Sequence, residues 1–309
     1  PPPPPPPPLF FLIIRRPTRS TPLYSSAASD VYKRQGFHMS EQAIKKILIT
    51  GANGFIGGSL MRYYQNHGQD TVGVDLIGND DDIVEGDISQ PDTISQQLQE
   101  CDVIIHTAAL VSNAMQDSDM WQVNVLATRN LIQAAKEHKV RRFVQISSIV
   151  AYGNSAEGEL DETHPVHADG GSYVLTKLAS EHVVLSEQAN DDIEVVIIRP
   201  GDAYGPGSRP WIIAPLEAIA KNQFMLPEKG EGFFRPIYID DLVRGIAIAS
   251  RHPDAAGEIF NLSCEGYMFT KDYFTPHYRW LGKKRPVVVS TKLALKISAI
   301  ASKLSLIHI

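Results

Sequence analysis

The 309-residue sequence contains little cysteine, few aromatic residues and no long apolar run. The two cysteines, Cys101 and Cys264, can form at most one disulfide, which excludes a disulfide-based scaffold and favours a reducing compartment, so we expect a cytoplasmic protein. The three tryptophans are too scattered to form a nucleic-acid stacking surface. The apolar run at 9–14 is far shorter than the roughly 20 residues of a membrane span. Basic residues follow this run instead of preceding it, unlike in a secretory signal.

Both ends of the sequence resemble translated sequencing adapter. Residues 30–35, DVYKRQ, back-translate as GATGTGTATAAGAGACAG, and the last six residues, LSLIHI, back-translate as its reverse complement. We therefore expect residues 1–38 and 304–309 to be artefacts, with the native C-terminus missing. Without them the totals of 29 basic and 35 acidic residues lose five and one, which leaves a net charge of -10. This excess of acid argues against a nucleic-acid surface and against binding to anionic membranes.

The composition, 43% hydrophobic and 21% charged, is typical of a globular protein and excludes collagen, coiled coil and wholesale disorder. From Lys46 onward, short β-branched runs alternate with helical patterns, as in parallel strands joined by crossover helices. Most of the runs are apolar throughout, which is typical of strands buried on both faces. We predict an α/β fold, a doubly wound parallel sheet of the Rossmann type, with strands at 46–50, 71–76, 102–109, 142–148, 194–200 and 258–263 and helices at 55–67, 92–100, 117–138 and 172–189.

The pattern becomes irregular after Pro200, where glycine and proline cluster ahead of a helical stretch at 212–222 and a loop at 223–235. We predict two domains, each discontinuous in sequence. A Rossmann domain comprises 39–200 and 236–262. A smaller C-terminal substrate-binding region comprises 201–235 and 263–303, and it ends in an amphipathic helix from Thr291.

The strongest local signal is TGANGFIG at 50–57, where a predicted strand ends and a helix begins. Gly51 permits a tight turn, Gly54 lets the backbone approach a pyrophosphate, and Gly57 allows close packing of helix and strand. The pyrophosphate would bind the first amides of the helix, where the helix dipole favours anions. The pattern predicts a dinucleotide cofactor.

Two acidic residues at strand ends extend this prediction. Asp75 ends the second strand, 18 residues after Gly57. A carboxylate there accepts hydrogen bonds from the adenosine ribose and repels a 2′-phosphate, so NAD is favoured over NADP. Asp87, in EGDI at 85–88, could meet the adenine edge, and a solvated loop acid is the alternative.

Tyr173 and Lys177, in YVLTK, are spaced to lie on one face of a helix, so the ammonium can lie close to the phenol. A nearby cation brings the pKa of a tyrosine down from about 10 toward working pH, as acid–base catalysis requires. Ser147 and Ser148 end the predicted strand at 142–148, at the sheet edge where ligands bind, and a hydroxyl there could hydrogen-bond a reacting oxygen. Each pattern alone also fits a surface or capping role.

Five motifs follow one another on the predicted elements: TGANGFIG, HTAA (106–109), SSIVAYG (147–153), YVLTK and RPGDAYGPG (199–207). Together they resemble the extended short-chain dehydrogenase/reductase family, which includes the NAD-dependent epimerases and dehydratases. The resemblance runs from about Lys46 to Leu262. It implies NAD as cofactor, a small-molecule substrate, Ser148 as the catalytic serine in preference to Ser147, Tyr173 as the acid–base residue, and Lys177 as the group that lowers its pKa and binds the nicotinamide ribose.

Further residues are assigned by this resemblance alone. It gives Asn124 a place in the catalytic site, with an ordinary satisfied helix amide as the alternative. Tyr204 would begin the substrate pocket, and Arg235 would hold the diphosphate of a nucleotide sugar. Pro236 stands where the family motif usually has an acid, which puts such a substrate in doubt. The remaining cofactor contacts are assigned to Phe55, Ile56, Ala108, Ala109 and Pro200.

Three functions remain open. PIYIDDLVRG (236–245) and the stretch after Leu281 resemble relatives such as 3β-hydroxysteroid dehydrogenase and dihydroflavonol reductase, which implies hydride transfer between NAD and a secondary alcohol or ketone. The alternatives are a nucleotide-sugar epimerase or dehydratase with tightly held NAD, and a non-catalytic NAD-binding regulator. We expect no metal site, because His164 and His167 lack the partner ligands that one needs. The resemblance also implies that the helices at 117–138 and 172–189 can pair subunits in a homodimer.

Overall fold

The computed structural model describes residues 44–78, 82–111, 117–153, 160–190 and 192–293. The predicted adapter segments, 1–38 and 304–309, lie outside these ranges, as does most of the predicted helix at 291–303. Within them, no helix combines the length and apolar character that a bilayer crossing requires. The chain forms two compact units: the first ends at Gly201 and resumes over Ile239–Leu262, and the second consists of Asp202–Tyr238 and the residues that follow from Ser263.

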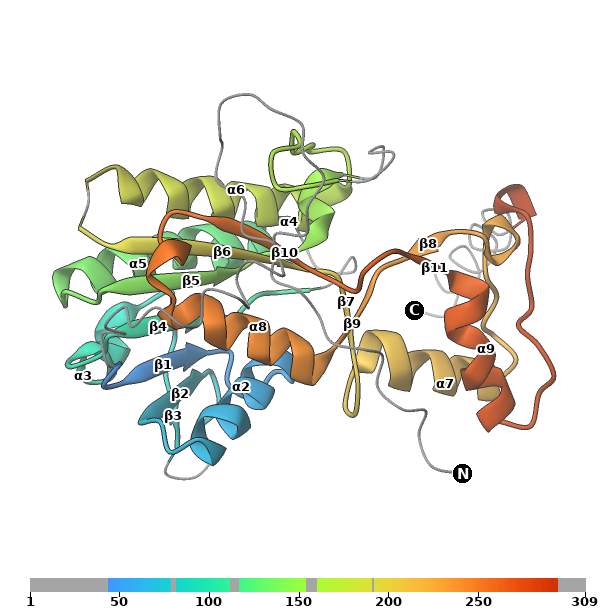
Figure 1. The fold of residues 1–309 in the computed structure, drawn as a ribbon, viewed down its shortest axis with the longest axis horizontal. Helices are drawn as coiled ribbons and strands as arrows, with labels where there is room; N and C mark the ends of the chain where they lie inside the picture. Colours follow the sequence, from blue (N-terminus) through green and yellow to red (C-terminus); the bar gives the residue numbers. More distant parts are fainter. Residues whose placement is uncertain (1–43, 79–81, 112–116, 154–159, 191, 294–309) are drawn as a thin grey trace, which may run out of the picture. The chain divides into compact units, whose positions relative to one another are not determined.

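The first unit is built on a seven-stranded sheet in which every strand pair is parallel (Figure 1). The strand order reverses between β1 and β4, so the predicted doubly wound α/β fold is confirmed. No bounds were predicted for the strand β3 ahead of Asp87, because three residues are too few to show alternation. From edge to edge the strands are β10 (Ile259–Leu262), β6 (Glu194–Pro200), β5 (Arg142–Ile146), β4 (Val103–His106), β1 (Ile47–Thr50), β2 (Thr71–Asp75) and β3 (Ile83–Glu85).

The sheet forms because its central strands are largely apolar and are buried on both faces. Every residue of β1, β4 and β5 is buried. Leu48 of β1 pairs with Val72 of β2 and with Ile104 of β4, and burying such a side chain contributes about 1.5–3 kcal/mol. The parallel register brings the carboxyl ends of the strands to one edge, where Thr50 is paired with His106. This edge carries the candidate site.

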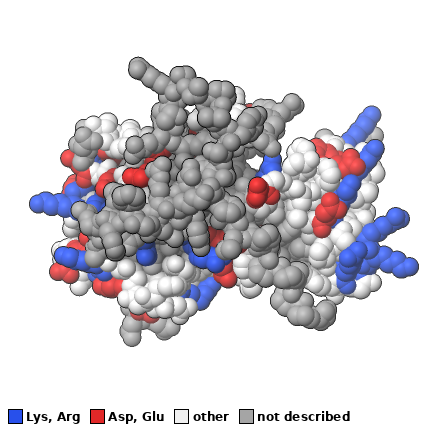
Figure 2. Space-filling model, viewed as in Figure 1, with Lys and Arg blue, Asp and Glu red and all other residues white. Residues whose placement is uncertain are grey.

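Helices cover both faces of the sheet (Figure 1). On one face α2 packs against α8 through a buried hydrogen bond of 3.0 Å between Tyr64 Oη and Ser250 Oγ. On the other face α6 contacts α4 and α5. Figure 2 shows acidic and basic side chains on the described surface of both units. The helices of this unit are α2 (Phe55–Asn66), α3 (Ser95–Leu98), α4 (Asp117–Trp121), α5 (Thr128–Glu137), α6 (Gly171–Glu187) and α8 (Ile239–Arg251).

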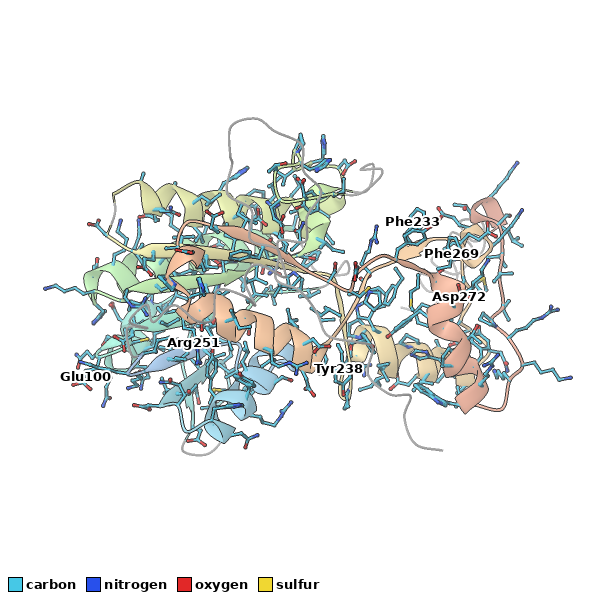
Figure 3. The ribbon with its side chains drawn as sticks, in the orientation of Figure 1. Glu100, Phe233, Tyr238, Arg251, Phe269 and Asp272 are labelled. Atoms are coloured by element: carbon cyan, nitrogen blue, oxygen red, sulfur yellow. The ribbon has the colours of Figure 1, made fainter. Side chains whose placement is uncertain are left out.

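The second unit is smaller and has an aromatic core. Phe234 and Tyr273 lie in it with ring centroids 4.0 Å apart, and Tyr204 packs edge-on against Tyr273. The ring of Phe233 on β8 stacks against the ring of Phe269 on the neighbouring strand β11 (Figure 3). The predicted loop at 223–235 contains β8, which is too short to show a period. The elements are β7 (Asp202–Tyr204), α7 (Ala214–Ala220), β8 (Phe233–Phe234), β9 (Pro236–Tyr238), β11 (Met268–Phe269) and α9 (Thr270–Trp280).

A buried arginine joins the sheet of the first unit to the end of α8. Arg142 on β5 is 1% exposed, and its Nε donates to Glu194 at 2.7 Å. Its Nη1 donates to the carbonyl oxygens of Ala249 at 3.0 Å and His252 at 2.8 Å. Carbonyls at a helix end have no partner within the helix, so Arg142 satisfies acceptors that burial would otherwise make costly.

We expect Arg142→Met to lower the free energy of unfolding by about 1–3 kcal/mol, because the buried carbonyl of Ala249 and the part-buried carbonyl of His252 lose their donor. Arg141→Met is the matched control. Arg141 contacts the same Glu194 carboxylate at 3.2 Å from a more exposed position, where an ion pair contributes about 1 kcal/mol or less. Urea denaturation followed by circular dichroism measures both variants, and equal losses would contradict the assigned role of Arg142.

Candidate cofactor and catalytic site

The glycine turn after β1 is so tightly closed that side chains are excluded from it. Gly51 has a φ of +67°, and a Cβ there would lie 2.8 Å from the Cα of Ala108, whose neighbour Ala109 is also half-buried. A Cβ on Gly57 would lie 2.1 Å from the Gly51 carbonyl oxygen, and one on Gly54 would lie 3.0 Å from the same atom. The turn and the loop after β4 therefore meet backbone to backbone.

This turn leaves the start of α2 open to a ligand. Gly54 is the N-cap residue and provides no side-chain cap. The N–H groups of Phe55 and Ile56, the first two residues of α2, have no acceptor within the helix. Unpaired amides at the positive end of a helix dipole suit a diphosphate. The turn therefore fits the dinucleotide that its sequence predicts.

The two predicted acids lie at the carboxyl ends of two neighbouring parallel strands: Asp75 ends β2, and Asp87 follows β3. The Asp75 carboxylate accepts from the N–H of Asn53 in the glycine turn at 2.9 Å and from the N–H of Leu76 at 2.8 Å. It holds the turn in place and keeps further lone pairs that could accept from ribose hydroxyls. The Asp87 carboxylate accepts from the N–H of Ser89 at 2.8 Å, which is a local turn contact.

A histidine at the end of β4 lies at the centre of a buried chain of hydrogen bonds, and the sequence analysis did not select it as a site residue. His106 is 1% exposed, and its ring nitrogens hydrogen-bond the hydroxyls of Thr50 at 2.7 Å and Thr128 at 2.9 Å. Burial lowers the pKa of His106 to about 3, and the nearby Lys177 acts in the same direction. The ring is therefore neutral, and it links β1 and β4 to the helix beyond.

Asn124 lies where the predicted helix at 117–138 departs from α-helical geometry. Residues Gln122–Ala127 form a π-helical turn between α4 and α5, a rare geometry that is frequent at functional sites. The Asn124 amide accepts from the N–H of Leu110 at 2.7 Å and donates to the Leu110 carbonyl at 3.0 Å and the Thr176 hydroxyl at 3.1 Å. It fixes the loop after β4 to α6, and a direct catalytic role stays a prediction.

Ser148 and Tyr173 meet at the carboxyl end of β5. Ser148 caps the 3₁₀ turn Ile149–Tyr152 by accepting from the N–H of Val150 at 3.3 Å. Its side chain also lies near enough to the Tyr173 phenol to act toward a lower pKa of that group. Ser147 is 5% exposed, and its hydroxyl has no hydrogen-bond partner among the residues that the structure describes. The structure therefore brings Tyr173 together with the serine that the resemblance selects.

Lys177 lies one helical turn after Tyr173, and its Nζ donates to the carbonyl oxygen of Ile146 at 3.0 Å. Burial lowers the pKa of Lys177 to about 8, against the effect of the Glu181 carboxylate. Burial also raises the pKa of Tyr173 to about 12, against the effect of the nearby Ser148 side chain. The expected lowering of the tyrosine pKa is therefore not found in this structure, because burial outweighs the effect of Ser148 and Lys177 contributes no resolved lowering.

The remaining predicted contacts are divided between the units. Pro200 is buried at the end of β6 in the first unit. Tyr204 and Arg235 belong to the second unit, where Tyr204 packs in the aromatic core. The Arg235 guanidinium donates to the carbonyl oxygen of Gly266 and lies 5.3 Å from the ring centroid of Tyr267. Arg235 is thus engaged within its own unit.

Glu181 and Arg199 form a buried ion pair that sequence reasoning missed. Arg199 Nη2 lies 2.6 Å from Glu181 Oε2, and the two side chains are 3% and 1% exposed. Glu181 follows Lys177 by four residues, so the spacing that selected Lys177 would have found it. His106 stands in the quoted HTAA motif, but only the fold shows its partners.

Comparison with known proteins decides the family. The model of the NAD dependent epimerase/dehydratase family matches residues 47–263. The chain belongs to this family. Its relatives are named as epimerases, dehydratases and dehydrogenases, and similar solved structures are complexes with NAD. The predictions of an enzyme, of the family and of NAD as its cofactor are therefore confirmed.

Relatives of this chain within the family are named for different reactions. The UDP-glucose 4-epimerase of Vibrio cholerae is 30% identical over 236 residues, which is 71% of this chain and 70% of that protein. The decarboxylating sterol-4-alpha-carboxylate 3-dehydrogenase of Candida albicans is 27% identical over 267 residues, 78% of this chain and 74% of that one. The solved UDP-glucuronic acid 4-epimerase of Bacillus cereus in complex with NAD has a TM-score of 0.71 at 27% identity, covering 80% of this chain and 88% of that one.

Gly57→Ala should weaken NAD⁺ binding by at least about tenfold, because the added Cβ would displace the Gly51 carbonyl and open the turn. Gly58→Ala is the control: its Cβ would lie 3.2 Å from the Ala52 carbonyl oxygen, which a small shift relieves. Isothermal titration calorimetry with NAD⁺ measures both. Wild-type affinity in the Gly57 variant would show that the tight turn does not support cofactor binding.

The neutral state of His106 makes the fold sensitive to acid. As the pH falls from about 6.5 toward 3, the unfolded chain takes up a proton on His106 that the folded protein does not, so the free energy of unfolding should fall over this range. His106→Gln removes that titration and should flatten the pH profile. His167→Gln, in an exposed loop, should keep the wild-type slope. Urea denaturation at a series of pH values tests this, and identical slopes in all three proteins would refute it.

Proposed function

We propose that the chain is an NAD-dependent oxidoreductase that moves hydride between the nicotinamide of NAD and a secondary alcohol or ketone. The observation that carries this proposal is the placement of Tyr173 beside Ser148, whose side chain acts on the pKa of the phenol, and one helical turn before the buried Lys177. These side chains belong to the same unit as the glycine turn. Bound NAD would supply the redox chemistry, while the protein positions the reacting groups.

The three side chains would divide the proton work. The Tyr173 oxygen takes the hydroxyl proton as the alcohol becomes a ketone, and it returns that proton in the reverse direction. The Ser148 hydroxyl donates to the same substrate oxygen as charge develops on it. Lys177, as a cation, stabilises the phenolate. A phenol with a pKa near 12 needs such support to exchange protons at neutral pH.

An apolar alcohol or ketone is the substrate class that we prefer. Arg235 is held by Gly266 and Tyr267, which argues against its use as a diphosphate clamp. Epimerisation or dehydration of a nucleotide sugar is the second candidate, supported by the 30% identity to a protein named UDP-glucose 4-epimerase. A homodimer and a cytoplasmic location complete the proposal, and light scattering after size-exclusion chromatography would test the first of these.

The two reactions differ in what happens to NAD. Dehydrogenation converts NAD⁺ to NADH as the alcohol is consumed, whereas an epimerase returns the hydride to its substrate. Incubation with NAD⁺ and a panel of secondary alcohols and UDP- or dTDP-sugars, followed by NADH absorbance and chromatography of the sugars, separates them. Accumulating NADH supports the dehydrogenase, and altered sugar without NADH supports the second candidate. Binding of NAD⁺ without turnover would favour a regulator and contradict both.

Tyr173→Phe should lower kcat by about 10²- to 10⁴-fold while NAD⁺ binding persists, because the variant loses only the proton-transfer group. Tyr63→Phe is the control, since Tyr63 lies on α2 with its ring against Tyr64 and His67. Steady-state kinetics and calorimetry with NAD⁺ give the two readouts. Unchanged turnover in the Tyr173 variant would remove its catalytic assignment.

A further inference from the structure

Three buried ionisable side chains lie beyond Tyr173, two of them on the same helix and the third on β6. Lys177 is 5% exposed, Glu181 is 1% exposed, and Arg199 of β6 is 3% exposed. Tyr173, Lys177 and Glu181 are spaced by four residues, so they follow one another along one face of α6. Neither Glu181 nor Arg199 has a part in the reaction proposed above.

Arg199 holds the Glu181 carboxylate with two parallel hydrogen bonds. Its Nε donates to Oε1 at 2.9 Å and its Nη2 donates to Oε2 at 2.6 Å, the planar geometry that arginine and carboxylate share. The third nitrogen of Arg199 donates to the Tyr152 hydroxyl at 3.0 Å, which in turn donates to Asn261 Oδ1 on β10 at 2.9 Å. The carboxylate is therefore fixed in position by α6, β6 and β10 together.

The groups that face Lys177 come from three elements. The carbonyl oxygen of Ile146, at the end of β5, accepts from Nζ at 3.0 Å. His106, from β4, is neutral, and Tyr173 is a protonated phenol. Glu181 is the acid whose charge acts on the lysine, and it opposes the burial that lowers the pKa of Lys177 to about 8. Without that carboxylate, burial would act on Lys177 unopposed.

We propose that Glu181, clamped by Arg199, is a positioning residue that keeps the buried Lys177 amine protonated one helical turn from Tyr173. The inference rests on the proposed function, in which Lys177 must be a cation to stabilise the phenolate. Glu181 itself touches no reacting atom in this scheme. It acts through Lys177, so its effect depends on pH.

The direct test is the titration of the Lys177 side chain. We expect Glu181→Gln to lower its midpoint by about one pH unit, because the neutral amide no longer favours the ammonium. The midpoint is read from the pH dependence of the Lys177 Cε resonance in protein labelled with ¹³C-lysine, assigned by its loss in Lys177→Arg. Glu187→Gln is the matched control: Glu187 lies on the same helix and pairs with Lys136 at 2.9 Å. An unchanged midpoint in Glu181→Gln, or an equal shift in the control, overturns the proposal.

The unpaired Arg199 charge could unfold the single variant. The double variant Glu181→Gln/Arg199→Met removes both charges. Loss of the Arg199 cation favours the ammonium slightly, so the midpoint should be lowered less than in Glu181→Gln, while a midpoint no lower than that of the wild type would also overturn the proposal. On a substrate found in the panel above, the alkaline limb of the kcat profile should move to lower pH with the midpoint. Lys177→Met separates the two claims. If it leaves turnover unchanged, the proposed function fails; if it abolishes turnover while Glu181→Gln leaves the limb in place, the inference fails alone.

Discussion

The whole site depends on one steric constraint, the backbone contact between the glycine turn and the loop after β4. Strands β1 and β4 are neighbours where the strand order reverses, so the turn and the loop leave the sheet side by side. With Ala108 against Gly51 and the Gly51 carbonyl against Gly57, the start of α2 is drawn onto the sheet edge. Only this approach leaves the first helical amides facing the space in which a dinucleotide's phosphates would lie.

Burial shifts the pKa values of two neighbouring groups, Tyr173 and Lys177, away from the values that the proposed reaction needs. It holds the proton on Tyr173 and weakens the hold of Lys177 on its own proton. Polar neighbours oppose both effects: Ser148 favours the phenolate of Tyr173, and the carboxylate of Glu181 favours the ammonium of Lys177. The dry surroundings that strengthen electrostatic interactions in a site thus also require a supporting network, which here extends through Arg199.

The parts of the protein that depend on local pattern could be predicted from the sequence. Apolar strands, the glycine turn and the spacing of Tyr173 and Lys177 each leave a signal within a few residues. The partners of His106 and of Glu181 depend on which strands become neighbours, and no local pattern carries that information. The pKa of Tyr173 was expected in the wrong direction because burial outweighs a charge that spacing alone suggests. Strands of two or three residues were missed because they show no period.

The π-helical turn at Gln122–Ala127 has a consequence for how the helix can change during evolution. Such a turn holds one residue more than an α-helical turn, and each residue of a regular helix advances by about 100°. Loss of a single residue here would restore regular geometry and rotate everything on one side of the turn relative to the other. Asn124 could then no longer reach Leu110 while Thr128 reaches His106. The extra residue therefore lets Asn124 and Thr128 each face its own partner. Insertions or deletions should be rarer in this turn than in surface loops.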